Sequence, residues 1–343
     1  MIKKTLVLVG FIAFAALLIS FTKEKPRQQV LKTIVIDAGH GIMPNGGYNG
    51  AKGSYSYEDE ISLAVSKKLI ALIQSELPEV KIVETRPTKY ITSLRDRADM
   101  ANQNRGELFV SIHVNAMPPI QKRTLAGYKN EVYYTGKGKN RKRKTRKVPQ
   151  YRHYEVPNTS VRGTQTYIWG AHKAEDKEVA IRENAPMLAE ENYQQKYGTI
   201  DPNSPEFVAL SLVKTKQFTQ RSATLASLVE TEFSKVGRVS GGARQRQVGI
   251  WVLQATAMPS ILVETGFITN PQEETYLNSE AGQQEIAYCI TAAVKKYIVH
   301  LEKKQGTGDK AMASPIPVLP EAFLEAFNDH GHGQHKEHVA PAR

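Results

Sequence analysis

The chain has 343 residues, of which 41% are hydrophobic and 23% are charged, and its formal net charge is +12 at pH 7. The composition is ordinary for a globular protein, and a body of roughly 280 residues is ample for one large domain with a full core. The single cysteine, Cys289, excludes an internal disulfide. Because Cys289 lies in an apolar helical pattern, we expect it to be a core residue.

Residues 1–25 read as a leader. Lys3 and Lys4 precede a nearly unbroken apolar run over residues 6–21. This run is shorter than the roughly 20 residues that a membrane-spanning helix needs, which favours an export signal. No clear A-x-A cleavage site is visible, so an uncleaved membrane anchor stays an alternative. In either case we expect the protein in the periplasm or cell envelope.

Strands and helices alternate in the next part of the chain. Apolar, β-branched residues at 33–36 predict a buried strand that runs into His40, between Gly39 and Gly41. We then expect an amphipathic helix over 58–75 that begins at Glu58, a strand over 81–85, a helix over 94–104 and a strand over 108–116 that carries His113. This order predicts an α/β fold with a parallel sheet.

Residues 117–160 interrupt the alternation with prolines, basic residues and tyrosines, and we interpret them as an insertion. Its segment 137–147 is so dense in Lys and Arg that we expect an exposed, mobile loop. The loop is either a solvated insertion or a contact for anionic cell-envelope polymers or lipid headgroups. Nucleic acid is not an expected partner, because an exported protein meets little of it.

Regular structure resumes at 162–169, where alternation predicts a strand nearer the edge of the sheet. Residues 172–210 are a second insertion, charged and mostly helix-compatible up to 198, and an amphipathic helix is expected over 217–235. A last strand pair is predicted at 249–253 and 260–266, with a terminal helix over 280–302. The tail 304–343 is rich in Pro and His, and we expect it to be flexible, with incidental metal affinity.

Three polar residues stand at the ends of these elements: His40, Glu58 and His113. Each alone has a structural explanation, as a hydrogen-bonded histidine at the rim of a core or as an acid that complements a helix dipole. Together, two histidines and a carboxylate are the ligand set of hydrolytic zinc, whose fourth position is left to water. A parallel sheet would gather them on one edge, so the sequence predicts a Zn²⁺ site.

Glu264 ends the apolar strand over 260–266. A carboxylate is costly to bury there unless it is paired or has a function, and a structural salt bridge is the alternative. Next to a zinc-bound water, such a carboxylate can carry a proton to a leaving amine. Amide hydrolysis is therefore the expected reaction class.

Four stretches of the chain resemble, in order, the signature blocks of zinc-dependent N-acetylmuramoyl-L-alanine amidases of the Amidase_3 type. They read IDAGHG at 36–41, EDEISLA at 58–64, SIHVNA at 111–116 and VETGFITNP at 263–271. The resemblance extends over roughly 31–116 and 160–300. Ala38 departs from it, because the family usually has proline there, but no ligand position is affected.

The resemblance implies that His40, Glu58 and His113 bind zinc and that Glu264 is the catalytic acid and base. It implies an amidase catalytic domain over 26–303, with a mostly parallel, roughly six-stranded sheet sandwiched between helices. The implied substrate is peptidoglycan, cleaved between the lactyl group of N-acetylmuramic acid and the L-alanine of the stem peptide.

Some amidases of this type have a helix that covers the zinc until a partner displaces it. Acids within 172–210 could do so here, which would require an activator protein, although solvated helical acids are the alternative. A murein-binding module without catalysis is the rival function. A zinc deacetylase or carboxypeptidase acting on other envelope material is a second enzymatic alternative.

Overall fold

The computed structural model describes residues 29–169, 218–246 and 250–306. Contacts divide the chain into two units, Met1–Val30 and Leu31–Arg343, and all helices and strands named below belong to the second. The predicted leader, the insertion over 172–210 and the tail beyond 306 lie outside the described residues. Within the described residues, no helix combines the length and the apolar character needed to cross a membrane.

Six strands form one sheet in the order β2-β1-β3-β8-β6-β7. All neighbouring strands are parallel except β6 and β8, which run antiparallel. Every residue of β1, β3 and β8 is buried, as expected for central strands whose two faces are both covered. The bounds are β1 Thr33–Ala38, β2 Lys81–Glu84, β3 Leu108–Asn115, β6 Thr164–Trp169, β7 Ser240–Arg246 and β8 Ser260–Phe267.

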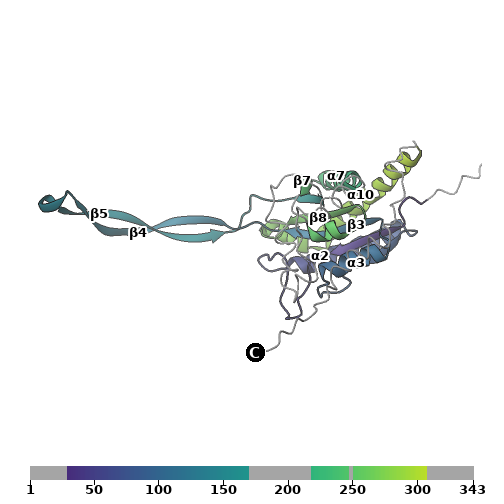
Figure 1. Cartoon of the computed structure of the whole chain (residues 1–343), viewed down its shortest axis with the longest axis horizontal. Coiled ribbons are helices and arrows are strands. Elements are labelled where there is room, and N and C mark those ends of the chain that lie inside the picture. The colour runs from purple at the N-terminus through teal and green to yellow at the C-terminus, as the bar shows by residue number, and fades with distance from the viewer. Residues whose placement is uncertain (1–28, 170–217, 247–249, 307–343) are drawn as a thin grey trace, which may run out of the picture. The chain divides into compact units, whose positions relative to one another are not determined.

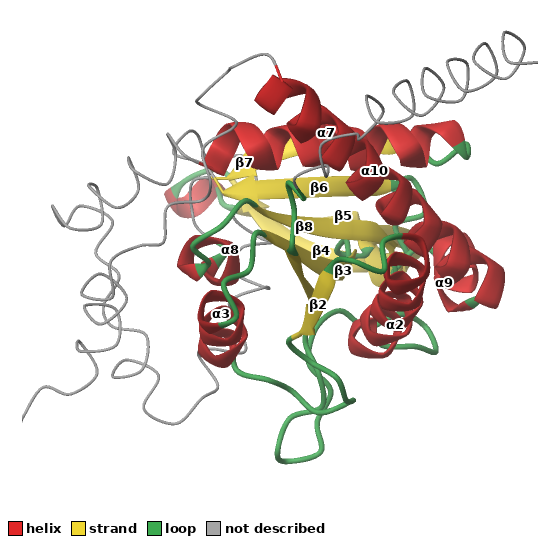
Figure 2. Cartoon of the chain, turned by 90° about the vertical axis from the view of Figure 1, so that its right-hand side faces the viewer, coloured by secondary structure: helices red, strands yellow, loops and turns green. Residues whose placement is uncertain are grey.

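Helices cover both faces of the sheet, as Figure 2 shows. One layer holds α2, α7, α9 and α10, and the opposite layer holds α3 and the short helix α8. The bounds are α2 Glu58–Glu76, α3 Leu94–Gln103, α7 Gln220–Lys235, α8 Trp251–Ala255, α9 Pro271–Asn278 and α10 Glu280–Gly306. The predicted α/β class, with a mostly parallel six-stranded sheet between helices, is confirmed.

Alternate side chains of the central strands form the core under α3 and α8. Val35, Phe109 and Leu262, one from each central strand, pack there with Val252 and Leu253 of α8. On α10, Cys289 is buried, as predicted. The three central strands are therefore fixed on both sides, and their carboxyl ends are fixed with them.

The expected loop over 137–147 is instead part of a long β-hairpin. Strands β4, Ile120–Thr135, and β5, Lys142–Val156, pair antiparallel in a two-stranded sheet of their own, joined by the 3₁₀ turn Gly138–Asn140. Figure 1 shows the two strands side by side as one ribbon. The prediction of exposure is confirmed, but that of a loop is wrong, because cross-strand hydrogen bonds can order a basic segment that has no core.

The prediction of a strand at 249–253 is also wrong. Ile250 precedes helix α8, and this short apolar run fills the core as a helical turn. A run of four apolar residues does not distinguish a strand from a helical turn by periodicity. The sheet is completed instead by β7, which was not predicted because its sequence contains two glycines and no apolar alternation. Helix α9 was also not predicted.

Replacing Phe109 by alanine is expected to lower the free energy of unfolding by about 3–5 kcal/mol, because it leaves a cavity in the middle of the sheet. The control is Tyr128→Ala on the exposed hairpin, which should change it by less than about 0.5 kcal/mol. Urea denaturation measures both. Similar losses for the two variants would contradict this placement of the core.

Candidate metal centre

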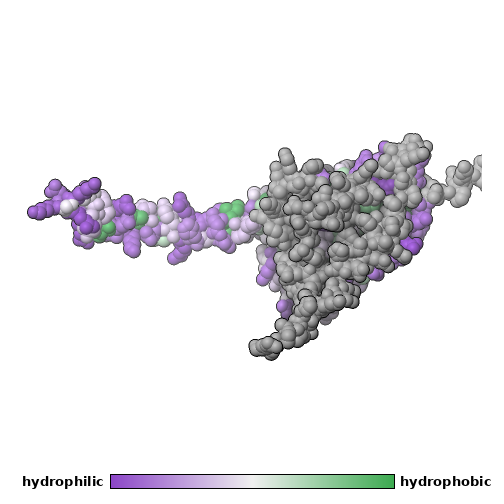
Figure 3. Space-filling view, viewed as in Figure 1, coloured by the Kyte–Doolittle hydropathy of each residue, from purple (hydrophilic) through white to green (hydrophobic). Residues whose placement is uncertain are grey.

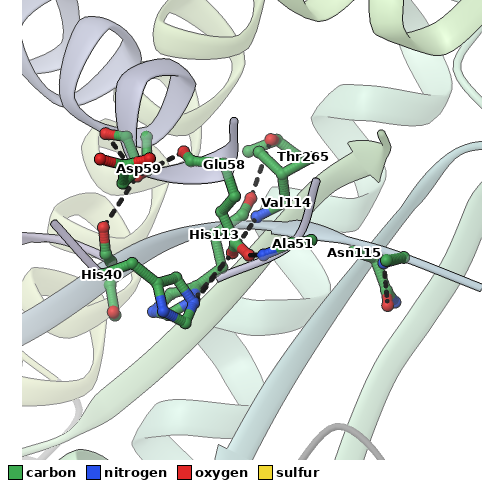
Figure 4. Close-up of polar contacts among 12 residues, drawn as sticks. His40, Ala51, Glu58, Asp59, His113, Val114, Asn115 and Thr265 are labelled. Atoms are coloured by element: carbon green, nitrogen blue, oxygen red, sulfur yellow. Dashed lines mark hydrogen bonds and ion pairs between the residues drawn. The ribbon is translucent and has the colours of Figure 1, made fainter. Parts of the chain in front are cut away.

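Three buried side chains converge from three elements of the fold. His40 follows the end of β1, Glu58 is the first residue of α2, and His113 lies near the end of β3. Each offers one ligand atom, and these atoms all lie within 4.8 Å of one another. The structure thus brings together the three residues that the sequence predicts as ligands (Figure 4).

The distances within this group suit a small tetrahedral ion. Oε1 of Glu58 lies 3.3 Å from Nε2 of His40 and 3.2 Å from Nδ1 of His113. Two ligand atoms that are each about 2.0–2.1 Å from a tetrahedral ion would be about 3.3 Å apart. The two imidazole rings meet edge to face, with centroids 4.9 Å apart. This group could therefore hold a metal ion.

Both carboxylate oxygens of Glu58 are held by backbone groups. The N–H of Val114 donates to Oε1 at 2.8 Å, and the N–H of Ala51 donates to Oε2 at 2.6 Å. Glu58 also stands in the first turn of α2, where a negative charge is favoured by the helix dipole. Its carboxylate is thereby fixed before any ion binds.

The turn that carries His40 has an unusual backbone, with φ of 61° at His40 itself. Two buried arginines hold this turn by its carbonyl oxygens. Arg97 donates to the carbonyls of Ala38 and His40, and Arg86 donates to those of Ala38 and Gly39. A left-handed conformation is costly for a residue other than glycine and persists only where its surroundings fix it. These arginines provide that fixation.

Asp37 is the counterion of this arrangement. It lies 2.8 Å from Nη1 of Arg97 and accepts hydrogen bonds from the hydroxyls of Thr85 and Ser111. Burial alone would raise the pKa of the Asp37 carboxyl, but Arg97 and the two hydroxyls outweigh it and hold the pKa below its ordinary value. Burial, aided by the charge of Arg97, lowers the pKa of Arg86 to about 10. Both groups thus stay charged at neutral pH.

Glycines leave room for the two imidazole rings. A Cβ at Gly39 would lie 2.5 Å from the ring of His113, and one at Gly50 would lie 2.7 Å from the ring of His40. Gly50 also has φ of +97°, which side chains rarely adopt. Nδ1 of His40 faces Oδ1 of Asn49 at 3.3 Å, so the neighbour of Gly50 orients that ring.

A carboxylate on α9 holds the loop that leads into Glu58. Glu274 accepts hydrogen bonds from the N–H groups of Ser54, Tyr55 and Ser56 and from the Ser56 hydroxyl. Burial alone would raise the pKa of Glu274, but these donors outweigh it and lower the pKa. The loop and the start of α2 are therefore tied to the C-terminal part of the domain.

Glu264 lies on β8 next to the candidate metal centre. Its Cα partner on β3 is His113, and because their strands are parallel the two side chains point to the same face of the sheet. Glu264 is buried, and the next residue, Thr265, donates to the carbonyl oxygen of His113 at 2.9 Å. Across the sheet, Gln165 of β6 is its other Cα partner. Glu264 and His113 are thus neighbours on adjacent strands, as expected.

A narrow cavity borders the two imidazoles on the side of α3 and α8. Besides His40 and His113, it is lined by Asp37, Arg97 and apolar residues that include Ile250 and Val252. The misassigned segment 249–253 therefore contributes to the wall of the site. Sequence reasoning also missed Arg86, Arg97 and Glu274 as supporting residues, because no periodic pattern indicates which charged residue is buried.

Comparisons with known proteins agree with one another. A family model described as N-acetylmuramoyl-L-alanine amidase matches residues 34–296. The chain is 28% identical over 270 residues to the amidase AmiC of Escherichia coli O6:H1, an alignment that covers 77% of this chain and 52% of AmiC. It is 26% identical over 281 residues to AmiA of Escherichia coli K12, covering 81% of this chain and 80% of AmiA. The chain thus spans about half the length of AmiC and about four fifths of AmiA.

Among solved structures, an N-acetylmuramoyl-L-alanine amidase from Clostridium difficile 630 is 24% identical to this chain, with a TM-score of 0.44. The match covers 78% of this chain and 97% of that structure.

Arg97→Gln is expected to lower the free energy of unfolding by about 3–5 kcal/mol, because it leaves Asp37 buried without its counterion. Arg95→Gln, on the same helix, removes a partly exposed pair with Asp99 and should cost about 1 kcal/mol at most. Urea denaturation at pH 7 compares the two variants. Equal effects would show that the Asp37 pair does not stabilise the turn.

The contribution of Glu274 is expected to depend on pH. Because its pKa is lowered on folding, the stability that its ionised carboxylate provides is fully present above the unfolded pKa near 4.5. That stability is lost as the pH falls through the lower native pKa. Glu274→Gln should therefore unfold more easily than the parent at pH 7, by about 1–3 kcal/mol, and this difference should shrink in acid. A difference that is constant from pH 7 to pH 3 would contradict the lowered pKa.

Proposed function

We propose a specific reaction for this chain, which belongs to the family of N-acetylmuramoyl-L-alanine amidases, enzymes that hydrolyse peptidoglycan. It cleaves the amide between the lactyl group of N-acetylmuramic acid and the L-alanine of the stem peptide. In this proposal His40, Glu58 and His113 hold a zinc ion, and Glu264 is the catalytic acid and base. The observation that carries the proposal is the convergence of these three buried donors within 4.8 Å.

The donor set supports zinc over magnesium or calcium. Two imidazoles and one carboxylate are a common catalytic zinc set with one position left open, whereas magnesium and calcium prefer oxygen ligands throughout. A zinc ion bound there would lower the pKa of a coordinated water toward about 7 and polarise the scissile carbonyl. Glu58 brings a negative charge that is already fixed by the N–H groups of Ala51 and Val114.

Glu264 would manage the protons of the reaction. The carboxylate accepts a proton from the attacking water, whose oxygen forms a bond to the lactyl carbonyl carbon. As the C–N bond breaks, Glu264 returns that proton to the nitrogen of L-alanine. The products are a free carboxylate on the lactyl group and a free amine on the stem peptide. Its Cα pairing with His113 puts Glu264 on the same face of the sheet as this ligand.

Three further proposals concern the whole protein. Residues 1–25 would direct export to the periplasm or envelope, either as a cleaved signal or as an anchor. Residues 172–210 would restrain the site until an activator protein binds. The basic segment 137–147 would contact anionic envelope polymers. A murein-binding module without catalysis is not favoured, because the matching family is described as N-acetylmuramoyl-L-alanine amidase and His40, Glu58, His113 and Glu264 are all present.

Glu264→Gln should keep its zinc and lose about 10²–10⁴-fold in turnover, because the amide side chain cannot accept the proton. His113→Ala should lose zinc and turnover together. Zinc is quantified by mass spectrometry of the purified protein, and turnover by the amines released from isolated sacculi. Glu60→Gln, an exposed acid of the first turn of α2, is the matched control and should behave as the parent.

The identity of the released groups separates the alternatives. An amidase exposes amino termini of L-alanine, a deacetylase releases acetate and a carboxypeptidase releases a C-terminal amino acid. Parent-like turnover in Glu264→Gln would remove this residue from the mechanism. Bound glycan without any new L-alanine terminus would favour the binding module.

A further inference from the structure

The β4–β5 hairpin, defined by residues 120–156, carries most of the excess charge of the protein. It contains twelve Lys and Arg residues and two acidic ones, a net charge of +10 out of the +12 of the whole chain. Nearly all of its side chains are exposed. A two-stranded ribbon alone is marginally stable in water, so a ligand that orders it would also stabilise it. Its charge requires that ligand to be anionic.

One face of the ribbon holds five of its seven exposed large apolar side chains, and Ile120 and Tyr154 lie on the other face. In the register of the hairpin, Leu125 faces Tyr151, Tyr128 faces Pro149, Val132 faces Thr145 and Tyr134 faces Arg143. Because alternate residues of β5 share a face, these pairs form one apolar stripe, whose members are Leu125, Tyr128, Val132, Tyr134 and Tyr151. All five are exposed, and Tyr128 and Tyr134 are 64% and 53% accessible. Apolar patches interrupt the hydrophilic surface of the ribbon in Figure 3.

Arg and Lys side chains lie beside these tyrosines and on both faces of the hairpin. The guanidinium of Arg123 lies over the ring of Tyr151 at 4.5 Å, and that of Arg141 lies over Tyr134 at 4.1 Å. On the other face, Lys144 is the cross-strand partner of Tyr133. Aromatic rings and positive charges thus lie close together on both faces of the ribbon.

This combination distinguishes between classes of anionic ligand. A bilayer surface would favour one apolar face with the cations set apart from it, whereas here cations occupy both faces. A simple polyanion would need the charges but not the exposed rings. A polysaccharide with carboxylates uses both, because sugar rings pack their C–H faces on tyrosines while the neighbouring cations neutralise the charges.

We propose that the β4–β5 hairpin binds glycan strands whose lactyl carboxylates are free. This inference rests on the proposed function, because each hydrolysis leaves one such carboxylate on the glycan. The enzyme would therefore have a second binding surface for its own product, which would hold it on a strand that it has begun to strip of peptides.

The test measures binding of the full-length protein to fluorescent glycan strands that another amidase has stripped of their stem peptides. Neutral N-acetylglucosamine oligomers serve as the uncharged comparison. The parent should bind the stripped strands at least about tenfold more tightly than the neutral oligomers. Because the strands are prepared separately, the result does not depend on whether this protein has amidase activity.

Two double variants separate charge from stacking. Lys142→Gln with Lys144→Gln removes two hairpin cations, and Tyr128→Ser with Tyr134→Ser removes two exposed rings at unchanged charge. Each should weaken binding by about tenfold or more. The matched control is Lys303→Gln with Lys304→Gln in the last turn of α10, which should bind as the parent. Circular dichroism checks that all variants are folded.

Three outcomes would overturn the proposal. The first is equal affinity for stripped strands and neutral oligomers. The second is tyrosine variants that bind as the parent while the lysine variants do not, which would indicate a general polyanion site. The third is tighter binding to inorganic polyphosphate or to phosphatidylglycerol vesicles than to the stripped strands. If binding holds but sacculi yield no L-alanine termini, the proposed amidase activity fails and the binding site remains.

Discussion

The candidate metal centre depends on a buried ion pair that is not part of it. Arg97 pairs with Asp37 inside the domain and, together with Arg86, holds the carbonyl oxygens of residues 38–40. A buried pair is weak evidence for stability in general, because desolvating two charges costs several kcal/mol. Here that cost is offset by hydrogen bonds to Thr85, Ser111 and the turn itself. The result is a left-handed backbone at His40 that no local preference would maintain.

The rest of the site follows from the parallel sheet. β1, β3 and β8 are adjacent and parallel, so their carboxyl ends lie at the same edge of the sheet. His40, His113 and Glu264 lie at or just after these ends. Glu58 reaches this edge from the start of α2, through a loop that Glu274 fixes from α9. Residues that are distant in sequence meet because rigid elements bring them together. Asn49 then orients the ring of His40, and the N–H groups of Ala51 and Val114 orient the carboxylate of Glu58.

Sequence alone predicted the central strands, the long helices and the three converging residues, because those features leave a periodic or positional signal. Apolar strands that end in His40, His113 and Glu264 are visible in the printed sequence. The buried state of Arg86 and Arg97 is not, since burial of a charged residue depends on partners from other elements. Helix α8 and the β4–β5 hairpin were misassigned for related reasons. A run of four apolar residues fits both a strand and a helical turn. In the hairpin, the dense run of charged residues gives no sequence signal for cross-strand pairing.

The proposed reaction requires that His40, Glu58 and His113 share one zinc ion. It is tested most directly by a crystal structure of the zinc-loaded protein, with anomalous diffraction recorded at the zinc absorption edge. We expect one strong anomalous peak about 2.0–2.2 Å from a nitrogen of each histidine and an oxygen of Glu58. A fully occupied peak that leaves out any of these three side chains would contradict it.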